Sequence, residues 1–234
     1  MGKGNYITQV PLTVPGCRLW LDAMDAATIT QSSTVSLWRD KSGSGNNASN
    51  ATGATQPTYS ASGLNGKPTI LYTLNKTLGN ATLPVLQQPF TLFYVVQNSN
   101  IVSASGAIIF QQGSNFLSRI NVPAESNRFS SFIKVGGGLE PGSRVSTTPV
   151  QGTPYILSVK YNGTTLTGTM HNNGDSISQT RTPADAGSLG YNISNNSTSD
   201  FATSEYLAYA VATSTDDTTR IARYLSNKWG IPIV

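Results

Sequence analysis

Short apolar runs bounded by Gly, Pro, Asn or Ser restrict the fold of this 234-residue chain more than any other feature. Each run has the length of a β-strand and is shorter than an average helix. The runs lie at residues 17–22, 35–39, 69–72, 90–96, 107–110 and 129–135. The run at 90–96 is apolar on both faces, so we expect a central strand with cover on both sides. Two packed sheets provide such cover.

Two Asn-Gly pairs in the second half of the chain indicate hairpin turns, because Asn-Gly favours the type I′ turn of a two-residue hairpin. Asn162-Gly163 and Asn173-Gly174 separate alternating segments at 156–161, 164–170 and 176–180. We therefore predict a three-stranded antiparallel meander. The segment at 205–212 indicates a further buried strand, in which small Ala side chains allow another element to approach closely.

One amphipathic helix is predicted near the C-terminus. Ser214 or Thr215 can cap its first turn, and Asp216 and Asp217 oppose the positive end of the helix dipole. Gly230 is placed to end it. One face of this helix is apolar and carries Ile221, Leu225 and Trp229. We expect this face to pack on the sheets.

The charged fraction of the sequence is low, at 11% against roughly 25% in an average soluble domain. The net charge is +4 and the sequence pI is about 9.2, with 15 basic and 11 acidic residues. The basic residues are scattered along the chain and form no phosphate-tracking stripe, which argues against nucleic acid as a partner.

Targeting and membrane segments are absent from the sequence pattern. The first residues lack the apolar region of a signal peptide, and no apolar run approaches the roughly 18 residues that span a bilayer. We therefore expect cytoplasmic synthesis without a signal peptide and no membrane partner. Cys17 is the sole cysteine, which excludes an internal disulfide framework and a multi-cysteine metal site.

The domain organisation follows from length, since all-β sandwiches commonly reach roughly 200–250 residues as one unit. We predict a single domain over residues 16–234. Residues 1–15 alternate apolar and polar side chains and contain two prolines, which indicates either an extended arm or an edge strand of the same sandwich.

Three segments together resemble the concanavalin A-like, laminin-G-like jelly-roll superfamily. They read Leu-Trp-Leu-Asp-Ala at 19–23, Trp-Arg-Asp-Lys-Ser-Gly-Ser-Gly-Asn-Asn-Ala at 38–48 and Arg-Tyr-Leu-Ser-Asn-Lys-Trp-Gly-Ile at 223–231. The motif Leu-Asn-Gly-Lys-Pro-Thr-Ile at 64–70 follows in the expected order. The resemblance covers residues 16–231. It implies an all-β fold, a two-sheet antiparallel jelly-roll sandwich with one C-terminal amphipathic helix.

The residues that carry the resemblance are structural in character. Trp20, Trp38 and Trp229 supply large apolar surfaces for a core, and their indole N–H groups need hydrogen-bond partners there. The segment 40–47 is rich in turn-forming residues, including Gly43, so we interpret it as an architectural loop rather than a ligand site.

Catalysis is the first function to test, because the superfamily includes glucanases that carry a Glu-x-Asp-x-Glu motif. A retaining glycosidase needs two carboxyl groups about 5–5.5 Å apart. Glu125, Glu140 and Glu205 are the only glutamates, and none has an acidic residue within three positions. We therefore predict no catalytic residues and no enzyme, and we interpret Glu205 as a structural hydrogen-bonding residue. An enzymatic reading would require loops to join distant acids such as Asp175 and Glu140.

Several other residues that could have a chemical function are interpreted as structural. His171 has no nucleophile-elbow motif beside it, so we expect an exposed or edge-strand histidine. Cys17 precedes an apolar run and is interpreted as a small buried hydrophobe. The tyrosines that could stack on sugar rings are more readily explained as packing residues: Tyr59, Tyr72, Tyr155 and Tyr191.

Calcium is the one cofactor that the resemblance raises, since many members of the superfamily bind it. Ca²⁺ takes about six to eight oxygen ligands, including carboxylates. Asp22, Asp25 and Asp40 are the only cluster that could supply them, and their spacing matches no known calcium loop. We therefore predict no cofactor and no metal site.

Two functions remain. The jelly-roll pattern that this chain resembles is found in bacterial surface proteins and in structural proteins of phages and large DNA viruses, and a stand-alone copy fits a virus particle best. The resemblance therefore implies, first, a non-enzymatic virion protein, such as a minor capsid, decoration or tail-associated subunit. Its partners would be other virion proteins, including the major capsid protein, or a second copy of the chain. The alternative is a lectin-like module that binds a glycan for surface attachment through Asn-rich loops.

Overall fold

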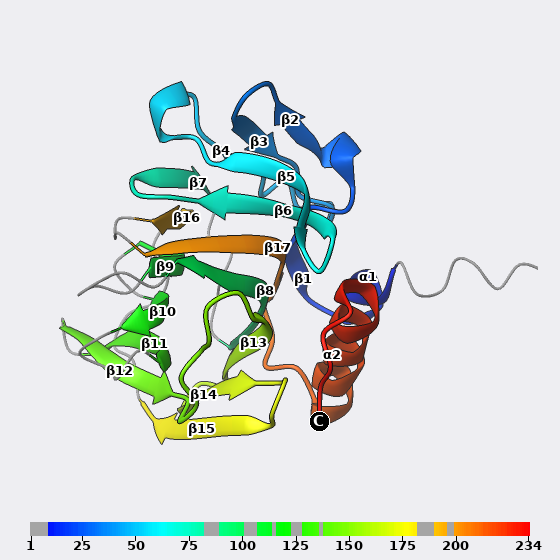
Figure 1. Cartoon of the computed structure of the whole chain (residues 1–234). Coiled ribbons are helices and arrows are strands. Elements are labelled where there is room, and N and C mark those ends of the chain that lie inside the picture. The colour runs from blue at the N-terminus through cyan, green and yellow to red at the C-terminus, as the bar shows by residue number, and fades with distance from the viewer. Residues whose placement is uncertain are drawn as a thin grey trace, which may run out of the picture.

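The computed structural model describes residues 9–81, 89–100, 107–113, 116–122, 128–135, 138–181, 190–195 and 199–234. Two antiparallel sheets pack face to face, and one long helix lies beside them at the C-terminal end (Figure 1). The predicted all-β, two-sheet sandwich with a C-terminal helix is confirmed.

The eight-stranded sheet is built around two long neighbouring strands, β8 (Phe90–Asn100) and β17 (Asp200–Tyr209). Outside β8 lie β13 (Pro154–Tyr161), β14 (Thr165–Met170) and β15 (Asp175–Thr180). The other edge of β17 is shared, because residues 201–203 pair with β6 (Lys67–Tyr72) and residues 205–209 pair with β1 (Cys17–Asp22). Beyond β6 lies β5 (Thr58–Leu64).

The nine-stranded sheet forms the second layer. Its strands, in order across the sheet, are β12 (Gly138–Arg144), β11 (Arg128–Val135), β10 (Phe116–Val122), β9 (Ala107–Gln112), β16 (Tyr191–Asn195), β7 (Lys76–Asn80), β4 (Ala48–Ser49), β3 (Val35–Trp38) and β2 (Ile29–Gln31). Two short 3₁₀ helices, η1 (Ala26–Thr28) and η2 (Gly53–Thr55), lie in the connections.

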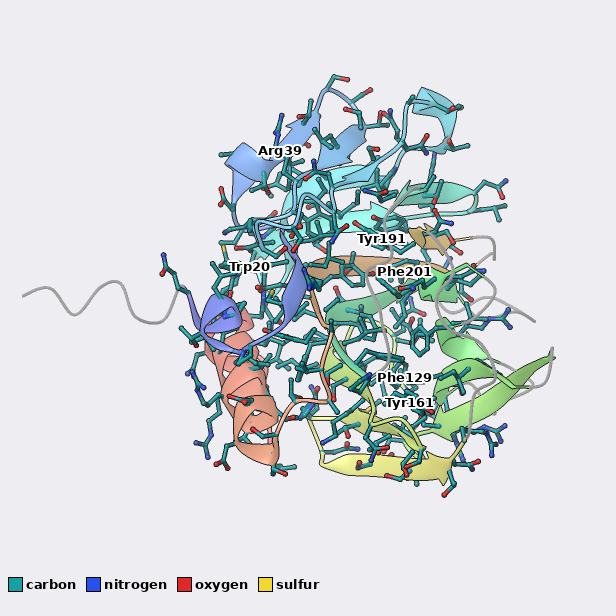
Figure 2. The ribbon with its side chains drawn as sticks, turned by 180° about the vertical axis from the view of Figure 1, so that it is seen from behind. Trp20, Arg39, Phe129, Tyr161, Tyr191 and Phe201 are labelled. Carbon is teal, nitrogen blue, oxygen red and sulfur yellow. The ribbon has the colours of Figure 1, made fainter. Side chains whose placement is uncertain are left out.

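Aromatic side chains fill the space between the sheets. The ring of Tyr206 on β17 packs edge-on against Trp38 and Tyr94, with centroids 6.1 and 5.5 Å apart. Such pairs are favoured by the quadrupoles of the rings. Figure 2 shows the same layer from behind and labels four further buried aromatics: Phe129, Tyr161, Tyr191 and Phe201. The predicted central strand at 90–96 is buried throughout.

The predicted meander is confirmed by β13, β14 and β15, which pair in unbroken antiparallel register. At its first turn, the Asn162 side chain accepts hydrogen bonds from the backbone N–H groups of Thr164 and Thr165 at 3.0 and 2.8 Å. Gly163 there has φ +104°, a backbone conformation that favours glycine.

The C-terminal helix is α2 (Thr215–Trp229), and its boundaries follow the predicted signals. Of the two candidate caps, Ser214 acts, because its Oγ accepts a hydrogen bond from the Asp217 N–H at 3.1 Å. Gly230 ends the helix in the left-handed conformation. No helix in the described part of the chain is long and apolar enough to span a bilayer.

The N-terminal segment differs in part from the predicted arm or edge strand over residues 1–15. Residues 1–8 lie outside the described residues, while α1 (Val10–Thr13) forms one helical turn that packs on α2. Pro11 sits in the first turn, where its missing N–H costs no hydrogen bond. Its carbonyl accepts a hydrogen bond from the Tyr209 hydroxyl at 3.2 Å.

Candidate functional site

Two buried carboxylates face each other where β1 meets β17. Asp22 is the direct partner of Glu205 in the antiparallel register, so both side chains lie on one face of the sheet. Since Tyr206 points between the sheets, Glu205 points to the opposite face, which α2 covers. Asp22 is 3% exposed and Glu205 1%. Two such carboxylates repel unless positive charge lies between them.

Two lysines supply that positive charge, each of them between two carboxylates. The Nζ of Lys228 on α2 lies 2.6 Å from Asp22 Oδ1 and 2.8 Å from Glu205 Oε2. The Nζ of Lys41 lies 2.9 Å from Asp22 Oδ2 and 2.9 Å from Asp25 Oδ2. The result is a row of alternating charges that runs from the buried Glu205 to the more exposed Asp25.

Glu205 accepts hydrogen bonds from three further donors. Its Oε1 accepts from Trp20 Nε1 at 2.7 Å and from the Tyr224 hydroxyl at 2.8 Å, and its Oε2 accepts from Trp229 Nε1 at 2.6 Å. Burial raises the pKa of the Glu205 carboxyl, and the neighbouring Lys228 opposes that rise. With Lys228 included, four donors surround one carboxylate, in agreement with its structural interpretation.

The three tryptophans therefore have different environments. The indoles of Trp20 and Trp229 share Glu205 as acceptor, which answers the predicted need for buried partners. The Trp38 indole N–H has no hydrogen-bond partner in the described part of the chain. Trp20 has a second role, because the Lys41 ammonium lies 4.3 Å from the centre of its ring.

The 40–47 loop positions Lys41. Asp40 holds the loop by accepting hydrogen bonds from the N–H groups of Trp20, Ser42 and Asn46 at 2.9, 2.8 and 2.9 Å. The architectural interpretation of the loop fits this geometry. The loop also carries Lys41 to the two aspartates; burial lowers its pKa, but contacts with both carboxylates outweigh that effect and raise it.

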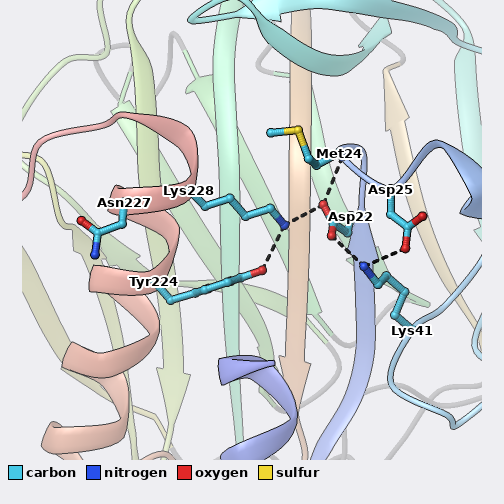
Figure 3. A pocket seen from close by; sticks show the side chains of 7 residues that line it. All are labelled: Asp22, Met24, Asp25, Lys41, Tyr224, Asn227 and Lys228. Carbon is cyan, nitrogen blue, oxygen red and sulfur yellow. Dashed lines mark hydrogen bonds and ion pairs between the residues drawn. The ribbon is translucent and has the colours of Figure 1, made fainter. Parts of the chain in front are cut away.

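A pocket of about 500 Å³ opens beside this row of charges. Figure 3 shows side chains from α2, from the end of β1 and from the 40–47 loop around it. The lining residues are Asp22, Met24, Asp25, Lys41, Tyr224, Asn227 and Lys228. Two carboxylates and two ammonium groups balance in charge, and the exposed Asn227 and Met24 add an amide and an apolar surface.

The calcium cluster considered from sequence is divided in the structure. Lys41 occupies the position between Asp22 and Asp25, whereas the Asp40 carboxylate is used by its own loop. Among the residues that the structure describes, no group of three or more His, Cys, Asp or Glu side chains could hold a metal ion.

His171 is half-buried and directly follows β14, an inner strand of its sheet, which corrects the expectation of an exposed or edge-strand histidine. Its ring stacks on Phe93, with centroids 6.0 Å apart, and its Nε2 lies 2.9 Å from Ser158 Oγ. The backbone N–H of Val234 donates to the His171 carbonyl at 3.2 Å, so the C-terminal residues lie beside it. Burial lowers the pKa of His171 to about 4.

The other singled-out residues have structural environments. Burial raises the pKa of the Cys17 thiol to about 12, which leaves little reactive thiolate. Asp175 accepts hydrogen bonds from Ser146 Oγ and the Thr147 N–H at 2.9 and 2.6 Å, while the Glu140 side chain lies outside the described residues. Among the candidate stacking tyrosines, Tyr59 is half-buried and three are buried: Tyr72, Tyr155 and Tyr191.

Sequence reasoning missed the pocket because its residues come from three separate segments. Asp22 lies in the 19–23 motif, Lys41 in the 38–48 motif and Lys228 in the 223–231 motif. Each motif was recognised, but only as a mark of the fold. The available signal was that each of the three motifs carries at least one charged residue in a chain with few charges.

Comparisons with known proteins identify the fold. No family model matches the sequence, and no curated protein matches it. A solved receptor-binding domain of botulinum neurotoxin type G is similar, with a TM-score of 0.64 at 12% identity over 93% of this chain and 54% of that chain. The serotype D ligand-binding domain, solved with N-acetylneuraminic acid, gives 0.65 at 11% identity over 95% and 56%.

A variant of a GH54 α-L-arabinofuranosidase gives a TM-score of 0.57 at 12% identity, over 93% of this chain and 60% of that chain. The chain thus spans little more than half of these solved chains, and the likeness is one of fold. None of these three structures is described as a viral protein, so the virion role stays a prediction.

Proposed function

We propose that this chain is a non-catalytic carbohydrate-binding module, and that the pocket between β1, the 40–47 loop and α2 receives a saccharide unit. The observation that carries the proposal is the charge-balanced lining of the pocket, which offers both hydrogen-bond donors and acceptors. Sugar hydroxyls donate and accept, so the half-exposed Asp25 carboxylate, the Lys41 ammonium and the exposed Asn227 amide can pair with them. Met24, 41% exposed, offers apolar surface to a sugar ring.

The absence of catalysis in this proposal rests on Glu205. Its carboxylate already accepts from two indoles, a phenol and an ammonium, and the residue is 1% exposed. A general acid or nucleophile must reach the substrate, and this group is enclosed on all these sides. The solved neighbours that bind or process sugars support carbohydrate as the ligand class.

A glycan array with the purified chain, followed by titration calorimetry on the sugars that bind, tests the proposal. We expect the same binding with millimolar calcium and with a chelator, because Lys41 lies between Asp22 and Asp25. Asn227→Ala should weaken binding about tenfold through a lost hydrogen bond, without lowering the thermal midpoint. Asp25→Asn should weaken binding by a similar factor and lower the thermal midpoint by at most about 2–4 °C, because it also breaks the partly exposed ion pair with Lys41.

Asn192→Ala, an exposed position on β16 in the other sheet, is the matched control and should bind like the unmodified chain. An array without binding in either condition would overturn the proposal. So would binding that both pocket variants leave unchanged.

A further inference from the structure

Three arginines, Arg119, Arg128 and Arg144, lie on neighbouring strands of the nine-stranded sheet, and none of them lines the pocket. In the registers of β10, β11 and β12, Arg119 is the direct partner of Ser130, and Ser130 is the direct partner of Arg144. Direct partners in antiparallel strands lie on the same face. Arg128 lies two residues before Ser130 on β11 and therefore shares that face.

This face points away from the core. Ser118 and Ser131, the chain neighbours of Arg119 and Ser130, point inward, where Ser118 Oγ lies 3.1 Å from the Tyr94 hydroxyl and 3.3 Å from Ser131 Oγ. Their neighbours must point outward. The Arg119 guanidinium lies 5.7 Å from the ring centre of Phe132, the next outward residue after Ser130.

The centre of the arginine group holds polar atoms without partners. Ser130 is fully buried, and its Oγ has no hydrogen-bond partner in the described part of the chain. The buried Nε atoms of Arg119 and Arg128 also lack acceptors among the described residues. Burial lowers the pKa of Arg119. An anion with several oxygens would pair with all of these donors.

We propose that the face formed by Arg119, Arg128, Arg144 and Ser130 is a second binding site, which takes the sulfate or carboxylate group of an acidic saccharide. A guanidinium presents two parallel N–H donors that match such oxyanions, and it does so more specifically than an ammonium. The inference that this face binds an oxyanion depends only on its own residues. The further inference that the oxyanion belongs to a saccharide rests on the proposed function. The compact group contrasts with the extended basic track that a nucleic acid backbone requires.

Titration calorimetry with a heparin-derived tetrasaccharide, its desulfated form and inorganic sulfate tests this site. We expect the sulfated form to bind, the desulfated form to bind at least about tenfold more weakly, and sulfate to compete. Arg119→Gln/Arg128→Gln should weaken tetrasaccharide binding about tenfold or more, and Ser130→Ala should also weaken it. The thermal midpoint should not fall, because these variants break no internal ion pair that involves described residues.

The matched control, Arg39→Gln/Arg223→Gln, removes two positive charges at exposed positions elsewhere. Equal weakening by both double variants would overturn the site, because it would show attraction by net charge alone. Equal or tighter binding of a twelve-nucleotide single-stranded DNA would also overturn it. Asn227→Ala should leave tetrasaccharide binding unchanged, so the failure of this site can be told apart from the failure of the pocket.

Discussion

At the scale of single residues, the Glu205 carboxylate is the shared hydrogen-bond acceptor that joins β1 and α2. Glu205→Gln replaces one acceptor oxygen with an amide donor that faces indole, phenol or ammonium donors, and it leaves Lys228 beside Asp22 alone. We expect the free energy of unfolding to fall by about 3–5 kcal/mol, as when one partner of a buried pair is removed. Urea unfolding followed by tryptophan fluorescence measures it. Asp216→Asn, at an exposed acid of α2, should cost at most about 1 kcal/mol; equal losses would contradict the prediction.

His171 makes stability depend on pH. Its pKa is lowered to about 4 in the folded chain, so the unfolded chain binds more protons between that value and the ordinary 6.5. The contribution of the neutral His171 to the free energy of unfolding is therefore complete above pH 6.5 and is lost as pH falls toward 4. Between pH 7.5 and 4.5, the unmodified chain should lose at most about 2–3 kcal/mol more than His171→Asn. Urea unfolding at both pH values tests this, and parallel losses would rule out the histidine as the cause.

At the scale of elements, α2 depends on a single cap. Ser214 accepts from the Asp217 N–H and its hydroxyl donates to the Asp217 carboxylate at 2.9 Å. Ser214→Ala should cost about 1 kcal/mol and lower the thermal midpoint by about 2–4 °C. Thr215→Ala is the control and should have a smaller effect, since the Thr215 side chain is exposed and caps nothing. A larger loss of stability from Thr215→Ala than from Ser214→Ala would show that Ser214 is not the cap.

Elements with a local signal could be predicted, and elements without one could not. The two Asn-Gly turns and the spacing in α2 specify their structure within a few residues, so the meander and the helix were found. By contrast, β12 contains Gly138, Pro141 and Gly142, which disfavour a strand, and it is held by pairing with β11. The helical turn α1 was missed because its packing on α2 is a contact between distant segments.

At the scale of the whole molecule, the sequence was sufficient for the sandwich and insufficient for its sites. Alternating burial is repeated in many strands, so the architecture is encoded many times. Each site depends instead on a register between strands far apart in the chain. The partnership of Asp22 with Glu205 and that of Arg119 with Ser130 and Arg144 follow from pairings that no local pattern specifies.

The shared edge of β17 has a consequence for how the chain is made. Strand β1 has its sheet partner at residues 205–209, and β6 and β8 each need β17 as a neighbour. During synthesis, β1 emerges from the ribosome first and must wait for nearly the whole chain before it can pair. The eight-stranded sheet therefore closes only after translation has passed β17, and until then β6 and β8 expose unpaired edges to other chains.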